Sequence, residues 1–483
     1  MNKLWSLSAV QISSGVRNGD FTVEDYVFQL LERINAIDKK INAFITVNEE
    51  ALETAREIDT KIKRRETIGP LAGVVVGVKD NICTKDIRTT CASKLLHEYM
   101  PPYDATVIRR LKEHDAIIIG KLNLDEFAMG STTEFGSFGP THNPWNPDYV
   151  VGGSSGGSAA SVAASECTAS LGSDTGGSIR CPASFCSVVG FKPTYGSVSR
   201  FGLISYSNSL EQIGPIARTV SDIVMMMNAI SGHDENDNTT RFQKKYEFSY
   251  ASDFENPVRF GLVKELIEGS DPVISRLVYS SMDLLSSIGF KWEEISLKSI
   301  DYSLASYYTI AMAEASSNLA RYDNLRYGFD CQPEGYEWNS YFSKIRNNFG
   351  DEVKKRIMVG SHVLLSGYYS KYYLKAQKIR SILRQEVKRL FKYVDVLISP
   401  TMPVLPFKVG EGIDDPMKRY LIDANTVIAN LVGTPAISIP AGFSDKLPIG
   451  IQLMADEMQD QLLLGVSKAY EKLAGIDRRP DFI

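Results

Sequence analysis

Hydrophobic and polar positions alternate between helical and strand-like periods along the first quarter of the chain. Apolar residues recur at helical spacing over residues 22–36, where Thr22 and Asp25 form a predicted capping pair. A second, more charged helix is predicted over residues 49–64. Continuous apolar runs at residues 71–82 and 116–120 predict buried strands, with a helix between them. The apolar face of the first helix contains Val27, Leu30, Leu31 and Ile34. This alternation of helices and strands indicates an α/β fold.

The same patterns continue to the end of the chain, without internal repeats or low-complexity segments. Further strands are predicted at residues 187–191, 259–263, 394–399, 436–440 and 449–454, and further helices at 105–112, 273–287 and 459–473. Residues 233–240 are polar and rich in turn formers, and they predict a surface excursion. Its acidic residues do not have the spacing of a calcium loop, so no metal site is predicted there.

Two clusters of glycine and serine stand out against this background, at Gly152–Ser158 and Gly172–Ser178. Glycine is costly to order unless the backbone needs a positive φ or a close approach. Apolar, strand-like sequence follows the second cluster, which argues against a flexible linker. Tight turns that pack a helix against a strand are the ordinary explanation for one such cluster, but two in one stretch favour a functional site.

Three kinds of chemistry are compatible with the clusters. A phosphate-binding loop requires a lysine after the glycines, and neither cluster has one. A nucleophile elbow matches Gly152–Gly156, but it requires a late histidine, and the last one, His362, lies in an apolar, helix-like run. The third is a serine hydrolase with a lysine base. Lys79 ends the apolar run of residues 73–78, and burial there would lower its pKa from about 10.4. A surface lysine at a strand end is the alternative.

Composition narrows the class of protein. The chain has 483 residues, 43% of them hydrophobic and 23% charged, which is typical of a globular protein. The formal net charge is −5, so the chain lacks the excess of positive charge that indicates direct binding to nucleic acid. The six cysteines form no CxxC pair, so they predict buried thiols rather than a zinc site or disulfides. The N-terminal sequence does not have the pattern of a signal peptide, and no apolar run is long enough to span a membrane. We therefore expect a cytoplasmic protein without a membrane partner.

Three motifs carry a resemblance to the amidase signature family: GGSSGGS at residues 152–158, DTGGSIR at 174–180 and KDN at 79–81. The resemblance implies an α/β fold in which helices cover both faces of a central mixed β-sheet. It also implies a Ser–cis-Ser–Lys triad, with Ser178 as nucleophile, Ser154 as bridging serine and Lys79 as base. Val151 stands where family members commonly have proline.

The resemblance extends to the groups around the triad. The backbone N–H groups of Thr175, Gly176 and Gly177, with that of Ser178, are expected to stabilise an oxyanion. A stretch that matches the substrate pocket of the family points to Met129, Gly130 and Ser131. Ser155 and Ser158 are interpreted as network or turn residues. Asp125 and Glu126 resemble a catalytic carboxylate pair, although the first turn of a helix explains them equally well.

The downstream half resembles one branch of the family, the glutamine-hydrolysing A subunits of tRNA-dependent amidotransferases. The similarity is carried by residues 307–323, 355–358 and 420–423. It implies that Arg356 binds the α-carboxylate of glutamine and Asp423 its α-ammonium group, with Tyr308 as a further pocket residue. A guanidinium pairs well with a carboxylate, and a carboxylate with an ammonium group. Without the resemblance, a surface ion pair would explain both residues.

The same branch implies partners and a division of labour. This chain would release ammonia from glutamine to convert Glu-tRNA(Gln), and in some organisms Asp-tRNA(Asn), to the amide. A B subunit would bind and activate the misacylated tRNA with ATP and Mg²⁺, and a small C subunit would join the two. No cofactor or metal is expected in this chain.

We predict one domain over residues 1–483, with an N-terminal helical layer (1–65), a signature core (about 70–230) and a substrate-specific part (about 300–440). Two alternatives remain at this point. A free-standing amidase would act on other small amides. A non-catalytic scaffold would have no need of an intact Lys79, Ser154 and Ser178.

Overall fold

The computed structural model describes residues 3–241, 248, 254, 257–325, 335–411 and 416–481. Its central feature is an eleven-stranded sheet with the strand order β1-β3-β2-β6-β8-β7-β12-β13-β11-β9-β10. The strands are β1 Phe44–Val47, β2 Val75–Lys79, β3 Ile117–Leu122, β6 Ala169–Asp174, β7 Val189–Lys192, β8 Gln212–Ala217, β9 Arg259–Val263, β10 Lys291–Ile295, β11 Val396–Pro400, β12 Ala436–Ser444 and β13 Leu447–Ala455. A small hairpin, β4 His142–Asn143 and β5 Asn146–Val150, lies apart from it.

The sheet is mixed, as predicted. Strand β2 runs parallel to β3 and β6, and β9 runs parallel to β10 and β11, while the other neighbours are antiparallel. The helices are α1 Ala9–Asn18, α2 Val23–Ile41, α3 Ala51–Lys63, α4 Thr106–Glu113, α5 Gly156–Ala163, α6 Arg180–Cys186, α7 Val220–Ile230, α8 Lys264–Glu268, α9 Pro272–Ser287, α10 Ser303–Asn318, α11 Trp338–Arg346, α12 Asp351–Val363, α13 Tyr373–Leu390, α14 Pro416–Leu421, α15 Val427–Val432 and α16 Asp460–Ala474.

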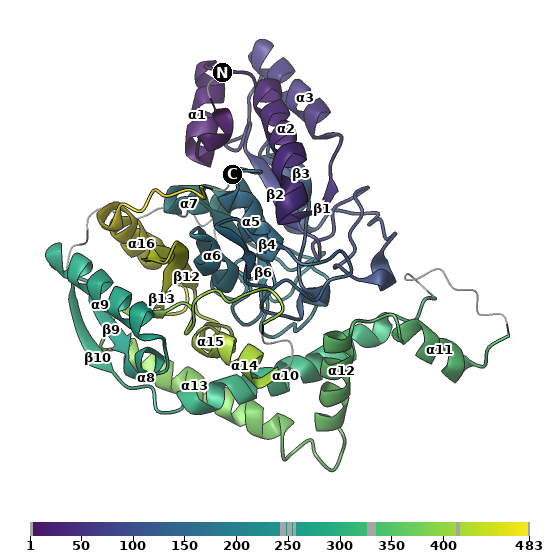
Figure 1. Ribbon diagram of the computed structural model, residues 1–483, viewed down its shortest axis with the longest axis vertical. Coiled ribbons are helices and arrows are strands. Elements are labelled where there is room, and N and C mark those ends of the chain that lie inside the picture. Colours follow the sequence, from purple (N-terminus) through teal and green to yellow (C-terminus); the bar gives the residue numbers. More distant parts are fainter. Residues whose placement is uncertain are drawn as a thin grey trace.

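Helices cover both faces of the sheet (Figure 1). Successive side chains of a strand point to opposite faces. In β2, Val76 and Val78 therefore join the core beneath α4, α7, α9 and α16, whereas Val75 joins the core beneath α2, α3 and α5. By this alternation, Lys79 points to the same face as Val75, towards the turn at the start of α5. The period of the sequence thus decides on which face the candidate base lies.

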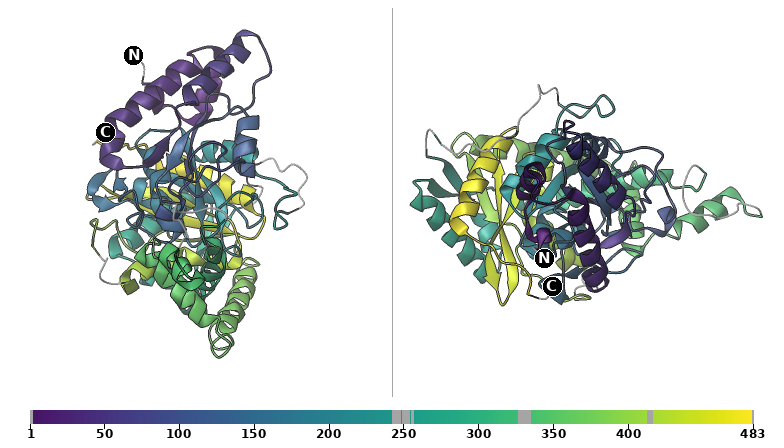
Figure 2. Two further views of the ribbon diagram at one scale, coloured as in Figure 1. Left: turned by 90° about the vertical axis from the view of Figure 1, so that its right-hand side faces the viewer. Right: turned by 90° about the horizontal axis from the view of Figure 1, so that it is seen from above.

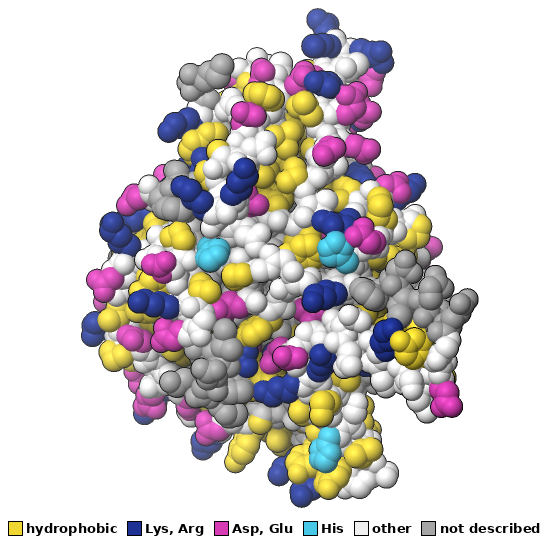
Figure 3. Space-filling view, turned by 45° about the vertical axis from the view of Figure 1, so that its right-hand side comes forward, with side chains coloured by type: hydrophobic (Ala, Val, Ile, Leu, Met, Phe, Trp, Pro, Cys, Tyr) yellow, Lys and Arg dark blue, Asp and Glu magenta, His cyan; other side chains and the backbone are white. Residues whose placement is uncertain are grey.

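The two ends of the molecule are helical (Figures 1 and 2). Helices α2 and α3 lie at one end, and Thr22 Oγ1 accepts the Asp25 N–H at 3.1 Å, so the predicted capping pair is confirmed. Helices α10, α12 and α13 lie at the other end and share a core of their own with α15. Figure 3 shows hydrophobic and basic side chains gathered at the lower tip, over the turn between α12 and α13.

The prediction for residues 233–240 is partly wrong. Asp234 and Asp237 are buried, because Asp234 Oδ2 accepts hydrogen bonds from the Thr106 and Ser199 hydroxyls and Asp237 Oδ2 accepts the Arg200 N–H at 2.8 Å. The turn is therefore fixed to the core. Across the ranges that the structure describes, no cluster of three or more His, Cys, Asp or Glu side chains could hold a metal ion.

Within the same ranges, no helix combines the length and apolarity needed to cross a membrane. The five described cysteines are free and buried, as predicted, whereas Cys331 lies outside the described residues. Eleven of the thirteen described strands, spread from Phe44 to Ala455, belong to one sheet. The division of the chain into one domain with three parts stays a prediction.

Candidate active site

Lys79 ends β2 with its ammonium group inside a ring of serine oxygens. Its Nζ lies 2.8 Å from both Ser154 Oγ and Ser155 Oγ, 2.9 Å from Ser173 Oγ and 3.2 Å from the Ser173 carbonyl oxygen. The side chain has no exposed surface. Gly77, on the same face of β2, makes room for Leu122 on the adjacent strand, because a Cβ there would lie 2.6 Å from Leu122 Cδ1.

Burial changes the acid–base behaviour of this lysine. It lowers the pKa of Lys79 from 10.5 to about 7, although the nearby Asp125 and Asp174 carboxylates act in the opposite direction. Both the charged and the neutral amine are therefore populated near neutral pH. A neutral amine accepts a proton, so Lys79 can act as a base where an ordinary surface lysine cannot.

Ser154 lies in the sharp turn that leads into α5. The Gly153–Ser154 peptide bond is cis, as the family resemblance implied. Gly153 must lack a side chain, because a Cβ there would lie 2.3 Å from Asp125 Oδ2, and Gly152 has a φ of +80°. The glycines of this first cluster thus allow the backbone to pass close to Asp125 while Ser154 faces Lys79.

Ser178 lies in the second cluster, between β6 and α6. The Ser155 N–H donates to the Ser178 carbonyl at 3.1 Å, and this bond holds the two clusters together. Lys79 and Ser154 are fully buried, whereas 8% of the Ser178 surface is exposed. Of the three predicted triad residues, Ser178 is therefore the one that a substrate can reach.

A buried ion pair shapes the turn that carries Ser178. Asp174 Oδ1 accepts the Gly177 N–H at 2.8 Å, Oδ2 accepts the Ile179 N–H at 3.2 Å, and both oxygens accept hydrogen bonds from Arg180. Burial alone would raise the pKa of Asp174, but the Arg180 guanidinium holds it well below its usual range. The carboxylate therefore stays charged and fixes the turn.

The predicted oxyanion donors differ from one another in their hydrogen bonds. The Gly177 N–H is already used by Asp174. Among the described residues, no acceptor is found for the N–H groups of Thr175, Gly176 and Ser178. Gly176 lies directly beneath an aromatic ring, since a Cβ there would lie 2.3 Å from Tyr307 Cζ. In the described part of the chain, three of the four expected donors are thus free, and the fourth is occupied by Asp174.

The predicted ammonium-binding carboxylate, Asp423, is buried beside two other predicted pocket residues. Its Oδ1 accepts the Ser131 hydroxyl at 2.9 Å, and its Oδ2 accepts the Tyr308 hydroxyl at 2.6 Å. Burial raises the pKa of Asp423 to about 6, although these two hydrogen bonds oppose the rise. Asp423 is therefore mostly ionised at neutral pH and is already held by neutral donors.

Arg356 lies over the ring of Tyr308, whose hydroxyl bonds to this carboxylate. Its Cζ is 5.5 Å from the centre of the Tyr308 ring, its Nε donates to Glu352 Oε1 at 2.8 Å, and its Nη1 donates to the Tyr206 hydroxyl at 2.9 Å. Burial by itself would lower the pKa of Arg356, but Tyr206, Glu352 and neighbouring tyrosines raise it well above its usual value. One wall of the site thus carries a buried cation over the ring of Tyr308 and a buried carboxylate at its hydroxyl.

Met129 and Gly130 are buried next to Ser131, and their role as substrate contacts stays a prediction. Met129 is fully buried in the apolar cluster that also contains Tyr307 and Tyr308. Gly130 packs on Asp125, where a Cβ would lie 2.3 Å from the carboxyl carbon. These two residues support the wall, while the adjacent Ser131 contributes its hydroxyl.

The structure supports the helical-turn explanation for Asp125 and Glu126, because Asp125 is the N-cap residue of a short 3-10 helix, Glu126–Ala128, and Glu126 lies in its first turn. Asp125 makes no side-chain capping bond to its own helical turn, and it accepts the N–H groups of Thr133, Glu134 and Phe135 at 2.9 to 3.3 Å. Glu126 accepts the Ser93 hydroxyl, and its Oε2 accepts the Gly350 N–H at 2.7 Å. The two carboxylates therefore organise separate loops and do not form a catalytic pair.

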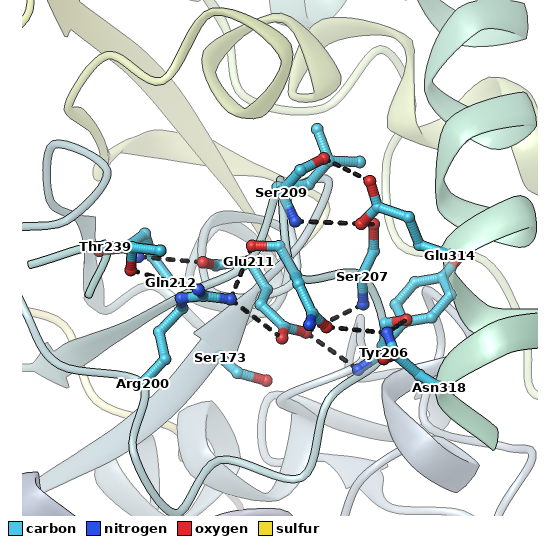
Figure 4. Close-up of polar contacts among 12 residues, drawn as sticks. Ser173, Arg200, Tyr206, Ser207, Ser209, Glu211, Gln212, Thr239, Glu314 and Asn318 are labelled. Carbon is cyan, nitrogen blue, oxygen red and sulfur yellow. Dashed lines mark hydrogen bonds and ion pairs between the residues drawn. The ribbon is translucent and has the colours of Figure 1, made fainter. Parts of the chain in front are cut away.

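Several residues around the site were not identified from the sequence. Figure 4 shows how Glu211 and Glu314 hold the loop that carries Tyr206: Glu211 accepts the Tyr206 and Ser207 N–H groups, and Glu314 accepts hydrogen bonds from Ser207 and Ser209. Glu352 could have been found, because it precedes Arg356 by four residues on one helix. Tyr206 could not, since no local pattern relates it to α12.

Comparison with known proteins agrees with this geometry. Residues 25–464 match the family model described as Amidase. The chain is 49% identical over 475 residues to the A subunit of glutamyl-tRNA(Gln) amidotransferase from Cenarchaeum symbiosum, with 98% of each chain covered. It is 48% identical to the protein of the same name from Sulfurisphaera tokodaii, over 95% of this chain and 96% of that one.

Solved structures show the same similarity. The crystal structure of the glutamyl-tRNA(Gln) amidotransferase A subunit from Thermotoga maritima superposes with a TM-score of 0.83 at 39% identity, covering 100% of this chain and 99% of that one. The peptide amidase of Stenotrophomonas maltophilia has the same TM-score at 27% identity, with 99% of each chain covered. The fold is thus shared with enzymes of different substrates, and the substrate has to be argued from the site.

Proposed function

Because the chain belongs to the amidase family, we propose that it is the glutamine-hydrolysing subunit of a glutamyl-tRNA(Gln) amidotransferase. The proposal is supported by relatives of that name with 48–49% identity over nearly the whole chain. It is carried by one structural observation: Tyr308 contacts both charged groups, with Arg356 over its ring and Asp423 accepting its hydroxyl. An α-amino acid has one carboxylate and one ammonium group, and this wall offers a partner for each.

In the proposed reaction, neutral Lys79 accepts the proton of the Ser154 hydroxyl, and Ser154 takes the proton of Ser178. Ser178 Oγ then attacks the side-chain amide carbon of glutamine and forms a tetrahedral oxyanion. The free N–H groups of Thr175, Gly176 and Ser178 stabilise that charge, and removing one donor of this kind typically costs about 100- to 1,000-fold in rate. The proton returns through the serines to the leaving nitrogen, and ammonia departs.

The second half of the reaction releases the acid. The γ-glutamyl ester on Ser178 reacts with water, whose proton is accepted by the same Ser154–Lys79 pair. Hydrolysis yields glutamate and restores the Ser178 hydroxyl. We further propose that B and C subunits receive the ammonia and use it, with ATP and Mg²⁺, to amidate the tRNA-bound glutamate. This chain itself then needs no cofactor or metal.

The test compares glutamine with analogues that lack one charged group. 4-Aminobutanamide lacks the α-carboxylate, and N-acetylglutamine lacks the ammonium group. We expect kcat/KM to fall at least 100-fold for each analogue in the wild type. Arg356→Met should remove the discrimination against the first analogue only, and Asp423→Asn the discrimination against the second.

A wild-type enzyme that hydrolyses the analogues and simple amides as fast as glutamine would instead be a general amidase, and the proposed function would be wrong. Lys355→Met is the matched control for Arg356→Met, because it removes the adjacent cation, whose Nζ lies 5.1 Å from the centre of the Tyr420 ring. Its discrimination should equal that of the wild type.

A further inference from the structure

The outer side of α13 and the turn before it carry a concentration of positive charge. Residues 367–392 contain eight lysines and arginines and one acidic residue, Glu386, within a chain whose net charge is −5. Arg380 points inward and bonds to Ser209 and the Leu431 carbonyl. The other seven cations are exposed, and we call them the basic face: Lys371, Lys375, Lys378, Arg384, Lys388, Arg389 and Lys392.

The basic face forms a stripe rather than a scatter. Lys375, Lys378 and Arg389 follow at intervals of three and eleven residues, which places them on one side of α13. Lys371 and Lys392 lie in the turns just before and just after the helix. The opposite side of α13 is buried through Ala376, Leu383 and Val387. An 18-residue helix is about 27 Å long, so the stripe extends over about that length.

Carboxylates do not neutralise this charge. Among the residues that the structure describes, none of the seven cations forms an ion pair. Glu386 is engaged elsewhere, since it accepts the N–H groups of Lys298 and Ser299. Most solvated helix faces mix the two signs, whereas this one presents only positive charge to its surroundings.

Exposed aromatic rings border the stripe at the turn between α12 and α13. Tyr368 and Tyr369 are each 38% exposed and Tyr372 is 39% exposed, and the Lys371 ammonium lies 5.4 Å from the Tyr372 ring centre. Leu365 and Met358, nearby, are 54% and 71% exposed. Figure 3 shows this mixture of yellow and dark blue side chains at the lower tip. Side chains of this kind are costly to leave in water without a partner.

Three kinds of partner have to be weighed against this chemistry. A membrane surface would need the apolar side of α13, which is already packed against the core. Protein interfaces are depleted in lysine, which supplies five of the seven cations. RNA combines a polyanionic backbone with bases that stack on aromatic rings, and a basic stripe bordered by tyrosines matches both.

We propose that the basic face is an RNA-binding surface that contacts the backbone of the tRNA, with Tyr368, Tyr369 and Tyr372 stacking on unpaired bases. The choice of tRNA among RNAs rests on the proposed function, but the surface itself does not. The net charge of the whole chain does not reveal this stripe, because the excess of acidic residues lies in other parts of the chain. The proposal departs from the sequence-based expectation, which rested on net charge alone.

The test measures binding of the full-length chain to a fluorescein-labelled tRNA(Gln) transcript by fluorescence anisotropy at several salt concentrations. In the first variant, Lys371, Lys375, Lys378 and Arg389 are replaced by glutamine. The control variant replaces four exposed lysines on separate elements, Lys39, Lys85, Lys291 and Lys446, and so has the same net charge. We expect at least tenfold weaker binding for the first variant only.

Salt dependence provides a second readout. Each lost phosphate contact reduces the slope of log affinity against log salt by about 0.7 to 0.9, so four contacts change it by about three. A third variant, with Tyr368, Tyr369 and Tyr372 replaced by leucine, should weaken binding without changing the slope, because stacking releases no counterions. Thermal unfolding midpoints equal to that of the wild type would confirm that these exposed substitutions leave the fold intact.

Four outcomes would overturn the inference. The chain could fail to bind the tRNA, or both four-residue variants could lose affinity equally, which would reflect net charge alone. The tyrosine variant could bind as tightly as the wild type, which would contradict the proposed stacking of the tyrosines on unpaired bases. The basic-face variant could bind tRNA normally while losing its hold on candidate protein partners, which would make the face a protein interface. Because no glutamine is used, RNA binding without ammonia release would contradict only the proposed function.

Discussion

Glu126 and Gly350 are 224 residues apart in the sequence, and Glu126 Oε2 accepts the Gly350 N–H at 2.7 Å. Gly350 is the residue before α12, the helix that carries Glu352 and Arg356. Glu126 directly follows Asp125 in the segment that leads to Ser131. This single hydrogen bond therefore joins the half of the site that contributes Ser131 to the half that contributes Arg356.

We predict that Glu126→Ala raises KM for glutamine about tenfold and lowers kcat by less than threefold. The alanine removes the acceptor for Gly350, so α12 and Arg356 lose their fixed position, while Lys79, Ser154 and Ser178 are untouched. Glu126→Gln keeps an acceptor oxygen and should restore most of the affinity. Steady-state kinetics with glutamine and with acetamide separate the two effects. Equal losses for both substrates would contradict a positioning role.

Activity should rise with pH through the titration of Lys79. Because burial lowers the pKa of this lysine to about 7, the neutral amine that accepts the serine proton increases from a small fraction at pH 5.5 to nearly all molecules at pH 8.5. We expect kcat/KM for acetamide, which has no titrating groups of its own, to increase about tenfold between pH 6 and pH 8. The measurement is a pH–rate profile.

Lys79→Arg is the companion variant, since arginine cannot lose its proton in a protein. It should be inactive at every pH tested. A wild-type profile that is flat over this range would contradict the assignment of Lys79 as the base.

The Glu352–Arg356 pair should contribute to stability as well as to binding. The two side chains are only 6% and 4% exposed, and removing one partner of a buried ion pair typically costs about 3–5 kcal/mol because the other charge is left unpaired. We predict that Glu352→Ala lowers the free energy of unfolding by about 3 kcal/mol in urea titrations. Asp351→Ala breaks the exposed pair to Lys354 on the same helix and should cost less than about 1 kcal/mol. Similar losses for both variants would show that the pair is not selectively important.

Gly176→Ala should abolish most of the activity, since a Cβ there would lie 2.3 Å from Tyr307 Cζ and would displace the turn that presents the oxyanion donors. We expect kcat to fall at least 100-fold, measured with acetamide. Gly367→Ala, where no atom lies within 4 Å of the added Cβ, is the control and should be neutral. The double variant Gly176→Ala/Tyr307→Leu should recover part of the loss, because leucine does not reach the position of the phenol. A double variant as inactive as the single one would indicate that Tyr307 is not the obstacle.

Much of the fold could be predicted from the sequence because its elements follow local periods. The helix over residues 22–36 and its cap, the strand that ends at Lys79 and the strand at residues 259–263 are all confirmed. The mixed sheet was expected from the family resemblance. The periodicity of hydrophobic residues along the chain does not predict the strand order, in which β8 separates β6 from β7 and β11 separates β13 from β9.

The candidate site divides in the same way. Lys79, Ser154 and Ser178 belong to recurring motifs, and Ser131, Tyr308, Arg356 and Asp423 were found by resemblance; the structure brings them into one region, while their roles stay predictions. The acceptors of buried polar groups could not be found, because they depend on tertiary contacts. The loss of the Gly177 N–H to Asp174 and the bond from Gly350 to Glu126 are of this kind.

The measurement that tests the central claim most directly is ammonia release from glutamine by the chain with its candidate B and C partners, ATP and misacylated tRNA. We would compare the wild type with Ser178→Ala and with Ser161→Ala, a buried serine whose hydroxyl only bonds within α5 and the turn after it. The account predicts that Ser178→Ala loses at least 1,000-fold in kcat, that Ser161→Ala keeps most of its activity, and that partners and tRNA stimulate the wild type. Ammonia release that survives Ser178→Ala would contradict the assignment of the nucleophile and, with it, the proposed reaction.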